Sequence, residues 1–116
     1  MKLFVKTKDK KYPIYFGINN CFKIKQILVE NNVNTKRLVV IYDRNVPRKI
    51  ITKLRQKLKK GENTFIGINF NEKMKNLKTV VKILNILGKN NFNRNDCLIS
   101  IGGGIAGDIC AFAASV

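Results

Sequence analysis

The chain has 116 residues, 45% of them hydrophobic, and its 23 Lys and Arg against 7 Asp and Glu leave a formal charge of +16. This length suits one compact domain with a modest core, and no apolar stretch reaches the roughly 20 residues that a membrane span needs. The chain has no histidine, the residue that most often acts as a metal ligand or general base. Its three cysteines lack C-x-x-C spacing, which argues against a zinc knuckle and a disulfide framework. This cysteine usage suits a reducing cytoplasm.

The first part of the chain predicts two short strands, a helix and a buried strand. Residues 3–6 and 12–16 are β-prone and flank a polar segment, so we expect a pair of strands joined by a turn. Apolar residues have helical spacing over 22–28, in a helix that ends near Asn31. Residues 37–42 predict a buried strand, because this apolar run is short and rich in β-branched residues.

The rest of the chain alternates helices with strands. The predicted elements are a helix over 46–60 ended by Gly61, a strand over 64–69, a helix over 77–87 closing near Gly88, a strand over 97–101 and a helix over 105–116. The last helix is apolar on every side, so it needs neighbours around it.

Continuously apolar strands that alternate with helices predict a parallel sheet with helices on both faces. We therefore expect an α/β, Rossmann-like fold preceded by a short strand pair. Right-handed crossovers bring the carboxyl ends of the three strands to one edge, outside which such sheets bind ligands. A polar cluster follows each strand, and the three clusters are Asp43-Arg44-Asn45, Asn71-Glu72 with Lys75, and the glycine turn with Asp108.

The glycine turn consists of Gly102, Gly103 and Gly104, between the last strand and the last helix. Glycines can adopt positive φ and let a ligand approach the backbone, while the helix start directs free N–H groups and a positive dipole end at an anion. A dinucleotide pyrophosphate suits such a site, although the spacing is not G-x-G-x-x-G. The alternative is a connection without a ligand, in which three glycines would give up backbone entropy for nothing.

The polar clusters have both binding and structural interpretations. Asp43 or Glu72 can accept hydrogen bonds from ribose hydroxyls, as acidic residues do in other dinucleotide sites. Lys75 can balance phosphate charge or bond the adenine end, and Asp108 can reach the nicotinamide or a nearby hydroxyl. Structurally, Asp43 and Asn45 suit a turn or a helix cap, and Asp108 can stabilise the start of the helix.

The positive charge does not by itself indicate a nucleic-acid partner. Lysine supplies 18 of the 23 cations, the chain carries 15 asparagines, and this mix is typical of AT-rich coding sequence. The basic residues are scattered over every predicted surface, and aromatic residues are not interleaved with them as a stacking platform requires. We therefore expect no specific nucleic acid and no membrane as partners.

Several motifs carry a resemblance to one family. The segment from Gly102 to Asp108, followed by Phe112, resembles the GGGxxGD signature of the 3-dehydroquinate synthases. Further matches, in the same order as in the family, are Tyr12-Pro13-Ile14-Tyr15, Asp43-Arg44-Asn45-Val46, the segment from Glu72 to Leu77, and Arg94. Asn71 replaces a family glycine, and asparagine tolerates the left-handed conformation better than most residues.

The resemblance implies an enzyme that uses NAD and a divalent metal, zinc or cobalt, to convert the sugar phosphate 3-deoxy-arabino-heptulosonate 7-phosphate into 3-dehydroquinate and phosphate. This reaction belongs to the shikimate pathway of aromatic amino acid biosynthesis, in the cytoplasm, and the resemblance implies a homodimer. The NAD contacts that it implies are Asp43, Asn45, Glu72, Lys75, Gly103, Gly104, Ile105 and Asp108.

The family's metal ligands and most of its substrate-binding residues correspond to positions beyond Val116. We therefore expect residues 1–116 to be an NAD-binding amino-terminal domain, truncated at its C-terminal end, with no catalytic residue or metal ligand of its own and no activity alone. The alternatives are a fragment of a related sugar-phosphate cyclase or glycerol-type dehydrogenase, and a non-catalytic cationic binding domain.

Overall fold

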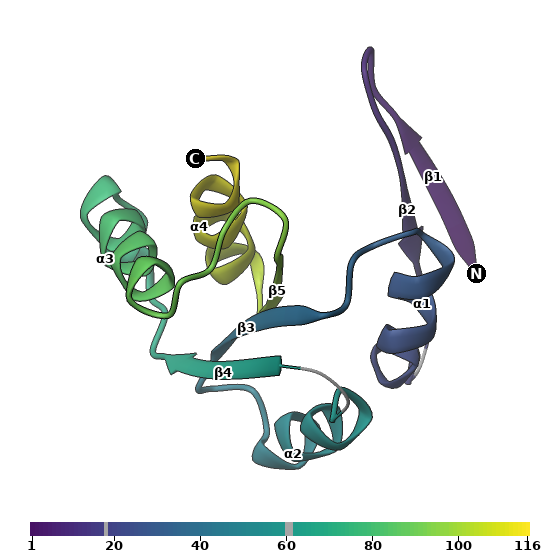
Figure 1. Cartoon of the computed structure of the whole chain (residues 1–116), viewed down its shortest axis with the longest axis horizontal. Helices are drawn as coiled ribbons and strands as arrows, with labels where there is room; N and C mark the ends of the chain where they lie inside the picture. The colour runs from purple at the N-terminus through teal and green to yellow at the C-terminus, as the bar shows by residue number, and fades with distance from the viewer. Residues whose placement is uncertain (18, 60–61) are drawn as a thin grey trace.

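The computed structural model describes residues 1–17, 19–59 and 62–116, in which a pair of strands precedes an α/β body (Figure 1). The elements in chain order are β1 (Lys2–Lys6), β2 (Lys11–Tyr15), the 3-10 turn η1 (Asn20–Lys23), α1 (Ile24–Glu30), β3 (Arg37–Asp43), α2 (Arg48–Lys57), β4 (Glu62–Ile68), the 3-10 turn η2 (Glu72–Met74), α3 (Leu77–Lys89), β5 (Cys97–Ile101) and α4 (Gly104–Ser115). No helix in these described ranges is long and apolar enough to cross a membrane.

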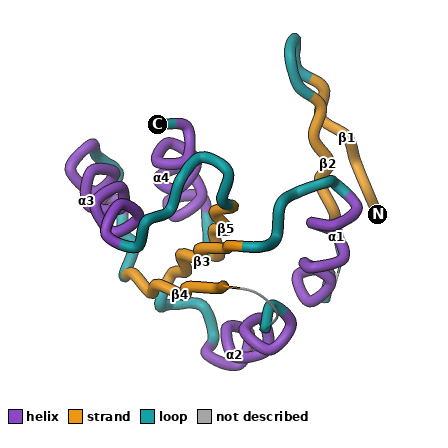
Figure 2. Tube along the Cα trace, in the orientation of Figure 1, coloured by secondary structure: helices purple, strands orange, loops and turns teal. Residues whose placement is uncertain are grey.

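The body is built on a three-stranded parallel sheet in the order β4-β3-β5 (Figure 2). In the central strand, Val40 lies opposite Phe65 of β4 and Ile99 of β5. β3 takes the middle place because its run from Leu38 to Ile41 is apolar on both faces and is fully buried there. The predicted Rossmann-like fold is confirmed.

Helices cover both faces of this sheet, and the side chains of β3 divide between them (Figure 1). Val39 and Ile41 belong to a core cluster with residues of α3 and α4. Leu38 and Val40 belong to a second cluster, against residues of α1 and the end of α2. Successive side chains of a strand point to opposite faces, so β3 supplies apolar contacts to both layers.

The strands β1 and β2 pair antiparallel, as predicted, and extend away from the body in Figure 1. Thr7 closes the turn between them, because its hydroxyl donates to the carbonyl of Lys10 at 3.0 Å. The pair is joined to the body by the amide of Asn31, which donates to the hydroxyl of Tyr15 at 3.0 Å.

Several helix bounds differ from the predicted ones. Helix α3 continues to Lys89, beyond the predicted end near Gly88, and α4 spans Gly104–Ser115 instead of 105–116. The first predicted helix begins as the 3-10 turn η1 and becomes α-helical only at Ile24. The second begins at Arg48 instead of at residue 46, because Pro47 takes φ −52° and ψ 133°, outside the helical region. It ends at Lys57, and its predicted end at Gly61 lies outside the described residues.

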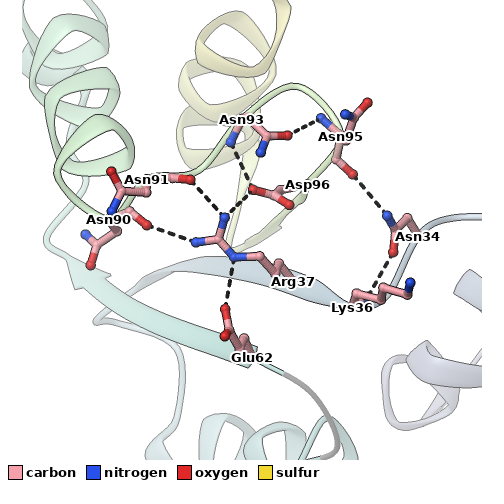
Figure 3. A network of polar contacts seen from close by, with 9 residues as sticks. All are labelled: Asn34, Lys36, Arg37, Glu62, Asn90, Asn91, Asn93, Asn95 and Asp96. Carbon is pink, nitrogen blue, oxygen red and sulfur yellow. Dashed lines mark hydrogen bonds and ion pairs between the residues drawn. The ribbon is translucent and has the colours of Figure 1, made fainter.

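A polar network around Arg37 joins several elements at the amino ends of the strands (Figure 3). The guanidinium group donates to the carboxylates of Glu62 and Asp96 at 3.0 Å each, and to the carbonyls of Asn90 and Asn91 at 2.9 and 2.8 Å. The network therefore connects β3 to β4, to the end of α3 and to the loop before β5. It lies at the opposite edge of the sheet from the glycine turn, because β3 runs from Arg37 to Asp43.

The last helix packs one side on the sheet and leaves the other side open. Its buried residues are Ala106, Ile109, Cys110 and Ala113. Phe112 is 52% exposed, and Val116 just after the helix is 58% exposed. The predicted need for neighbours is thus met on one side of α4 by the described residues.

Candidate functional site

The three polar clusters meet at the carboxyl edge of the sheet. A Cβ atom added to Gly102 would lie 3.1 Å from the Cβ of Asp43, so the glycine turn touches the end of β3. The backbone N–H of Arg44 donates to the carbonyl of Ile68 at 2.9 Å, which ties the loop after β3 to the end of β4. Parallel strands bring these loops together, as the sequence predicts.

Only one glycine of the turn has the positive φ that the sequence pattern allows for all three. Gly102 has φ +156°, and a Cβ there would also lie 3.0 Å from the Cβ of Ala106. Gly103 has φ −88°, and Gly104 is the first residue of α4. A Cβ on Gly103 or Gly104 would meet no atom of the described chain within 4 Å. The fold itself therefore requires Gly102, whereas Gly103 and Gly104 border open space.

Helix α4 begins at this open space. Gly103 is its N-cap residue, and within the described chain no side chain caps the helix. The first N–H groups of a helix have no partner inside it, so they are available to an anion at this place. The side chain of Ile105 packs against the core, and Ile105 can therefore offer a ligand its backbone N–H group.

Asp43 has the turn function that its position suggests. One carboxylate oxygen accepts a hydrogen bond from the backbone N–H of Asn45 at 2.9 Å, and the carbonyl of Asp43 accepts one from Val46 at 3.0 Å. These bonds hold the carboxylate at the edge beside Gly102. A carboxylate has a second oxygen and further lone pairs for a ligand.

Lys75 and Asp108, predicted as separate contacts, form an ion pair with each other. The Nζ atom of Lys75 lies 2.9 Å from Oδ2 of Asp108, and their side chains are 48% and 61% exposed. The hydrogen bond to Asp108 and its charge, with a further contribution from Glu72, raise the pKa of Lys75 above its ordinary value of 10.5. The second and third clusters are joined by this pair.

A groove of about 350 Å³ lies beside the ion pair, between the starts of α3 and α4. Its lining residues are Lys75, Asn76, Leu77, Val80, Asp108, Ile109 and Phe112. Sequence reasoning identified only Lys75 and Asp108 as site residues. Helical spacing could have identified Phe112 as well, because Phe112 follows Asp108 by four residues in the same helix and therefore lies on the same face.

The segment that carries Glu72 and Lys75 is ordered by local hydrogen bonds. The side chain of Asn76 caps α3 by accepting from the backbone N–H of Thr79 at 3.0 Å. Asn71 has φ −149° and ψ 168°, which is extended backbone, so the tolerance of asparagine for the left-handed conformation is not used there. Glu72 begins η2 and is exposed, and any side chain can occupy the extended position before it.

The described residues contain no group of three His, Cys, Asp or Glu side chains that could hold a metal ion. The glycine turn and the uncapped start of α4 are the features of this edge that suit an anion.

The chain is similar to several known proteins. A family model described as the amino-terminal part of 3-dehydroquinate synthase matches residues 65–116. The 3-dehydroquinate synthase of Pelagibacter ubique is 44% identical over 99% of this chain, and that of Buchnera aphidicola subsp. Cinara cedri is 35% identical over 98%. The chain covers 31% of each of these relatives, so it spans about a third of their length.

Two solved structures of 2-deoxy-scyllo-inosose synthase have the same fold. One of them is complexed with carbaglucose-6-phosphate, NAD+ and Co2+. They match with TM-scores of 0.83 and 0.84 at 19% sequence identity, over 100% of this chain and 32% and 33% of theirs. Together, the family model and the relatives show that the chain is similar to the amino-terminal region of the 3-dehydroquinate synthases.

Proposed function

We propose that the carboxyl edge of the sheet binds NAD and that residues 1–116 supply the NAD half-site of a 3-dehydroquinate synthase. The observation that carries this proposal is the open space over Gly103 and Gly104, beside the uncapped start of α4. Gly104 is the first residue of α4, where glycine costs stability relative to alanine, and no atom of the described chain accounts for it. A diphosphate close to the backbone accounts for Gly104 and for the open space over Gly103.

Each site residue has a defined contact in this proposal. The N–H groups of Gly104 and Ile105, with the backbone of Gly103, hold the diphosphate at the helix start. Asp43 and Glu72 accept hydrogen bonds from ribose hydroxyls, and Asn45 bonds the ligand from the same loop as Asp43.

The ion pair of Lys75 and Asp108 lies on the wall of the groove beside this turn. Lys75 balances phosphate charge, and Asp108 bonds the nicotinamide end or a hydroxyl group near it. The ion pair holds the two side chains together at this edge before a ligand arrives.

The complete enzyme, in this proposal, converts 3-deoxy-arabino-heptulosonate 7-phosphate into 3-dehydroquinate and phosphate in the cytoplasm, as a homodimer. When bound, NAD would supply hydride-transfer chemistry at a hydroxyl group of the substrate. The residues of this chain bind and orient the cofactor. The divalent metal and the phosphate of the substrate are held by side chains outside residues 1–116. The names of the curated relatives favour this enzyme over a glycerol-type dehydrogenase.

Titration calorimetry with NAD tests the proposal. Asp43→Asn retains the side-chain oxygen that closes the turn but removes the charge that bonds the ribose, and we expect NAD binding to weaken about tenfold. Glu30→Gln removes one negative charge from the exposed end of α1 and serves as the matched control.

The control should bind NAD as the unaltered chain does, and binding should persist in high salt. A heat signal that disappears with salt, or equal weakening in both variants, would indicate attraction to the general positive charge and would contradict the proposal.

A further inference from the structure

A second hollow, of about 460 Å³, lies between the end of β3 and helix α2. Its lining residues are Tyr42, Arg44, Val46, Arg48, Ile51, Thr52 and Arg55. None of the proposed NAD contacts is among these described lining residues. The hollow is therefore a separate place on the molecule, and the proposed function does not use it.

The alternation of β3 puts this hollow on the other face of the sheet from the NAD edge. Val39 and Ile41 pack toward α3 and α4, and Asp43 continues that series beside the glycine turn. Tyr42 belongs to the opposite series. A Cβ on Gly67 would lie 2.8 Å from the hydroxyl oxygen of Tyr42, so the ring lies directly over β4. Tyr42 thereby forms a fixed wall of the hollow.

Three arginines face the hollow, and no acidic residue lines it. Arg48, Thr52 and Arg55 are spaced by four and three residues, which places them on one side of α2, and Arg44 comes from the loop after β3. Among the described residues, the ion pairs involve Arg37 and Lys75 but none of these three arginines.

The guanidinium group of Arg55 is held in place, because its Cζ lies 4.7 Å from the centre of the Phe65 ring. Three unneutralised guanidinium groups around one hollow repel one another, and a bound anion removes that repulsion. The hollow has the volume of a small-molecule site rather than of a flat charged surface.

We infer that this hollow is a second anion site, which binds the phosphate group of a small phosphorylated metabolite. A guanidinium group presents a planar fork of donors that matches phosphate oxygens in pairs, and three of them suit a dianion. The hydroxyl groups of Tyr42 and Thr52 add neutral donors, while Val46 and Ile51 offer an apolar wall to the carbon part of the ligand. A nucleic acid fits less well, because the ring of Tyr42 lies over Gly67 and not in a stacking position.

A titration with inorganic phosphate, followed by amide NMR spectra at constant ionic strength in chloride, tests this inference on the 116-residue chain. The triple variant Arg44→Gln, Arg48→Gln, Arg55→Gln removes the site. The control Lys78→Gln, Lys82→Gln, Lys89→Gln removes the same charge from exposed positions of α3.

We expect phosphate to shift the signals of residues 48–55 with saturation, and its dissociation constant to rise at least about tenfold in the arginine variant and less than about twofold in the control. Replacing the same three arginines with lysine keeps the positive charge but removes the paired guanidinium donors, so most of the affinity for phosphate should be lost. The single variant Arg48→Gln, at an exposed helix position, gives the same comparison should the triple variant fail to fold.

Three results would overturn the inference. Equal weakening of phosphate binding in the triple arginine-to-glutamine variant and in the triple lysine-to-glutamine control would show attraction to net charge alone. Signal changes at Gly103 and Gly104 in place of residues 48–55, or displacement of phosphate by NAD, would assign phosphate to the dinucleotide edge. The third result is displacement of the phosphate by a single-stranded oligonucleotide. If the triple arginine-to-glutamine variant and the triple lysine-to-glutamine control then weaken oligonucleotide binding equally, the region is a nucleic-acid surface.

Discussion

Gly102 and Gly104 stand two positions apart in one turn, and the structure distinguishes their functions. Gly102→Ala should lower the free energy of unfolding by about 1–3 kcal/mol, because φ +156° is unfavourable to alanine and its Cβ would crowd Ala106 and Asp43. Gly104→Ala should raise it by about 0.4–1 kcal/mol, because alanine suits a helix and meets no atom there. Urea denaturation measures both changes.

The same pair separates stability from binding. If a diphosphate lies over Gly104, the alanine variant at that position gains stability and loses NAD affinity together. A Gly104→Ala chain that is stabilised and binds NAD unchanged would show that this glycine has no ligand beside it. An NAD affinity that rises together with the stability of the variant would lead to the same conclusion.

The ion pair of Lys75 with Asp108 predicts a measurable titration. The pKa of Lys75 is raised above its ordinary value of 10.5, so the pair contributes its full stability below pH 10.5 and loses it as the pH rises through the raised pKa. In Asp108→Asn the pKa of Lys75 should fall back toward its ordinary value. NMR titration of the Lys75 side chain measures it, with Lys78 of the same chain as an internal comparison. An identical Lys75 pKa in both chains would contradict the pair.

At the level of elements, the Arg37 network predicts a stability effect that is independent of the binding edge. Arg37→Met removes the donors to two carboxylates and two carbonyls, and should lower the free energy of unfolding by about 2 kcal/mol. Arg37→Lys should lose most of this, because an ammonium group cannot reproduce the fork. Arg94→Met, which removes a bond from an exposed arginine to Val116, is the control and should change stability by less than about 0.5 kcal/mol.

Thermal or urea unfolding measures these variants, and NAD titration checks the separation of functions. Arg37 lies at the amino end of β3, so NAD affinity at temperatures where the variant remains folded should be unchanged. Loss of affinity in a folded Arg37→Met chain would mean that the two edges of the sheet are coupled.

The elements themselves were largely predictable, and several of their bounds were not. Strand β5 begins and ends where the apolar run predicts, because both flanks are polar or glycine. Helix α2 starts two residues late because Pro47 takes a non-helical ψ, a local backbone choice that apolar spacing does not reveal. The separate 3-10 turn η1 is likewise a local departure within a correctly predicted helical region.

For the whole molecule, the proposed division of functions predicts a chain that binds NAD and does not turn over substrate. Residues 1–116 contain no histidine, and their described part holds no group of metal-ligating side chains. With the heptulosonate phosphate, NAD and zinc supplied, we expect no phosphate release by this chain in a coupled phosphate assay. A full-length 3-dehydroquinate synthase from one of the curated relatives provides the positive control for the assay. Turnover by the 116-residue chain would contradict the half-site proposal.

The sequence by itself determined the fold class, the parallel sheet and the meeting of three polar clusters at one edge. These follow from apolar periodicity and from the handedness of crossovers, which depend on local chemistry and chain connectivity. The motif around Asp108 likewise predicted the resemblance to the 3-dehydroquinate synthases, and a family model of their amino-terminal part matches residues 65–116.

Only the tertiary structure decided which side chains touch. The pairing of Lys75 with Asp108, the groove beside Phe112 and the arginine hollow beside Tyr42 join residues that are distant in sequence. Their contacts depend on how two layers pack on opposite faces of one sheet. A one-dimensional pattern assigns each residue to a face, but the distance between two faces or two helices follows from packing in three dimensions.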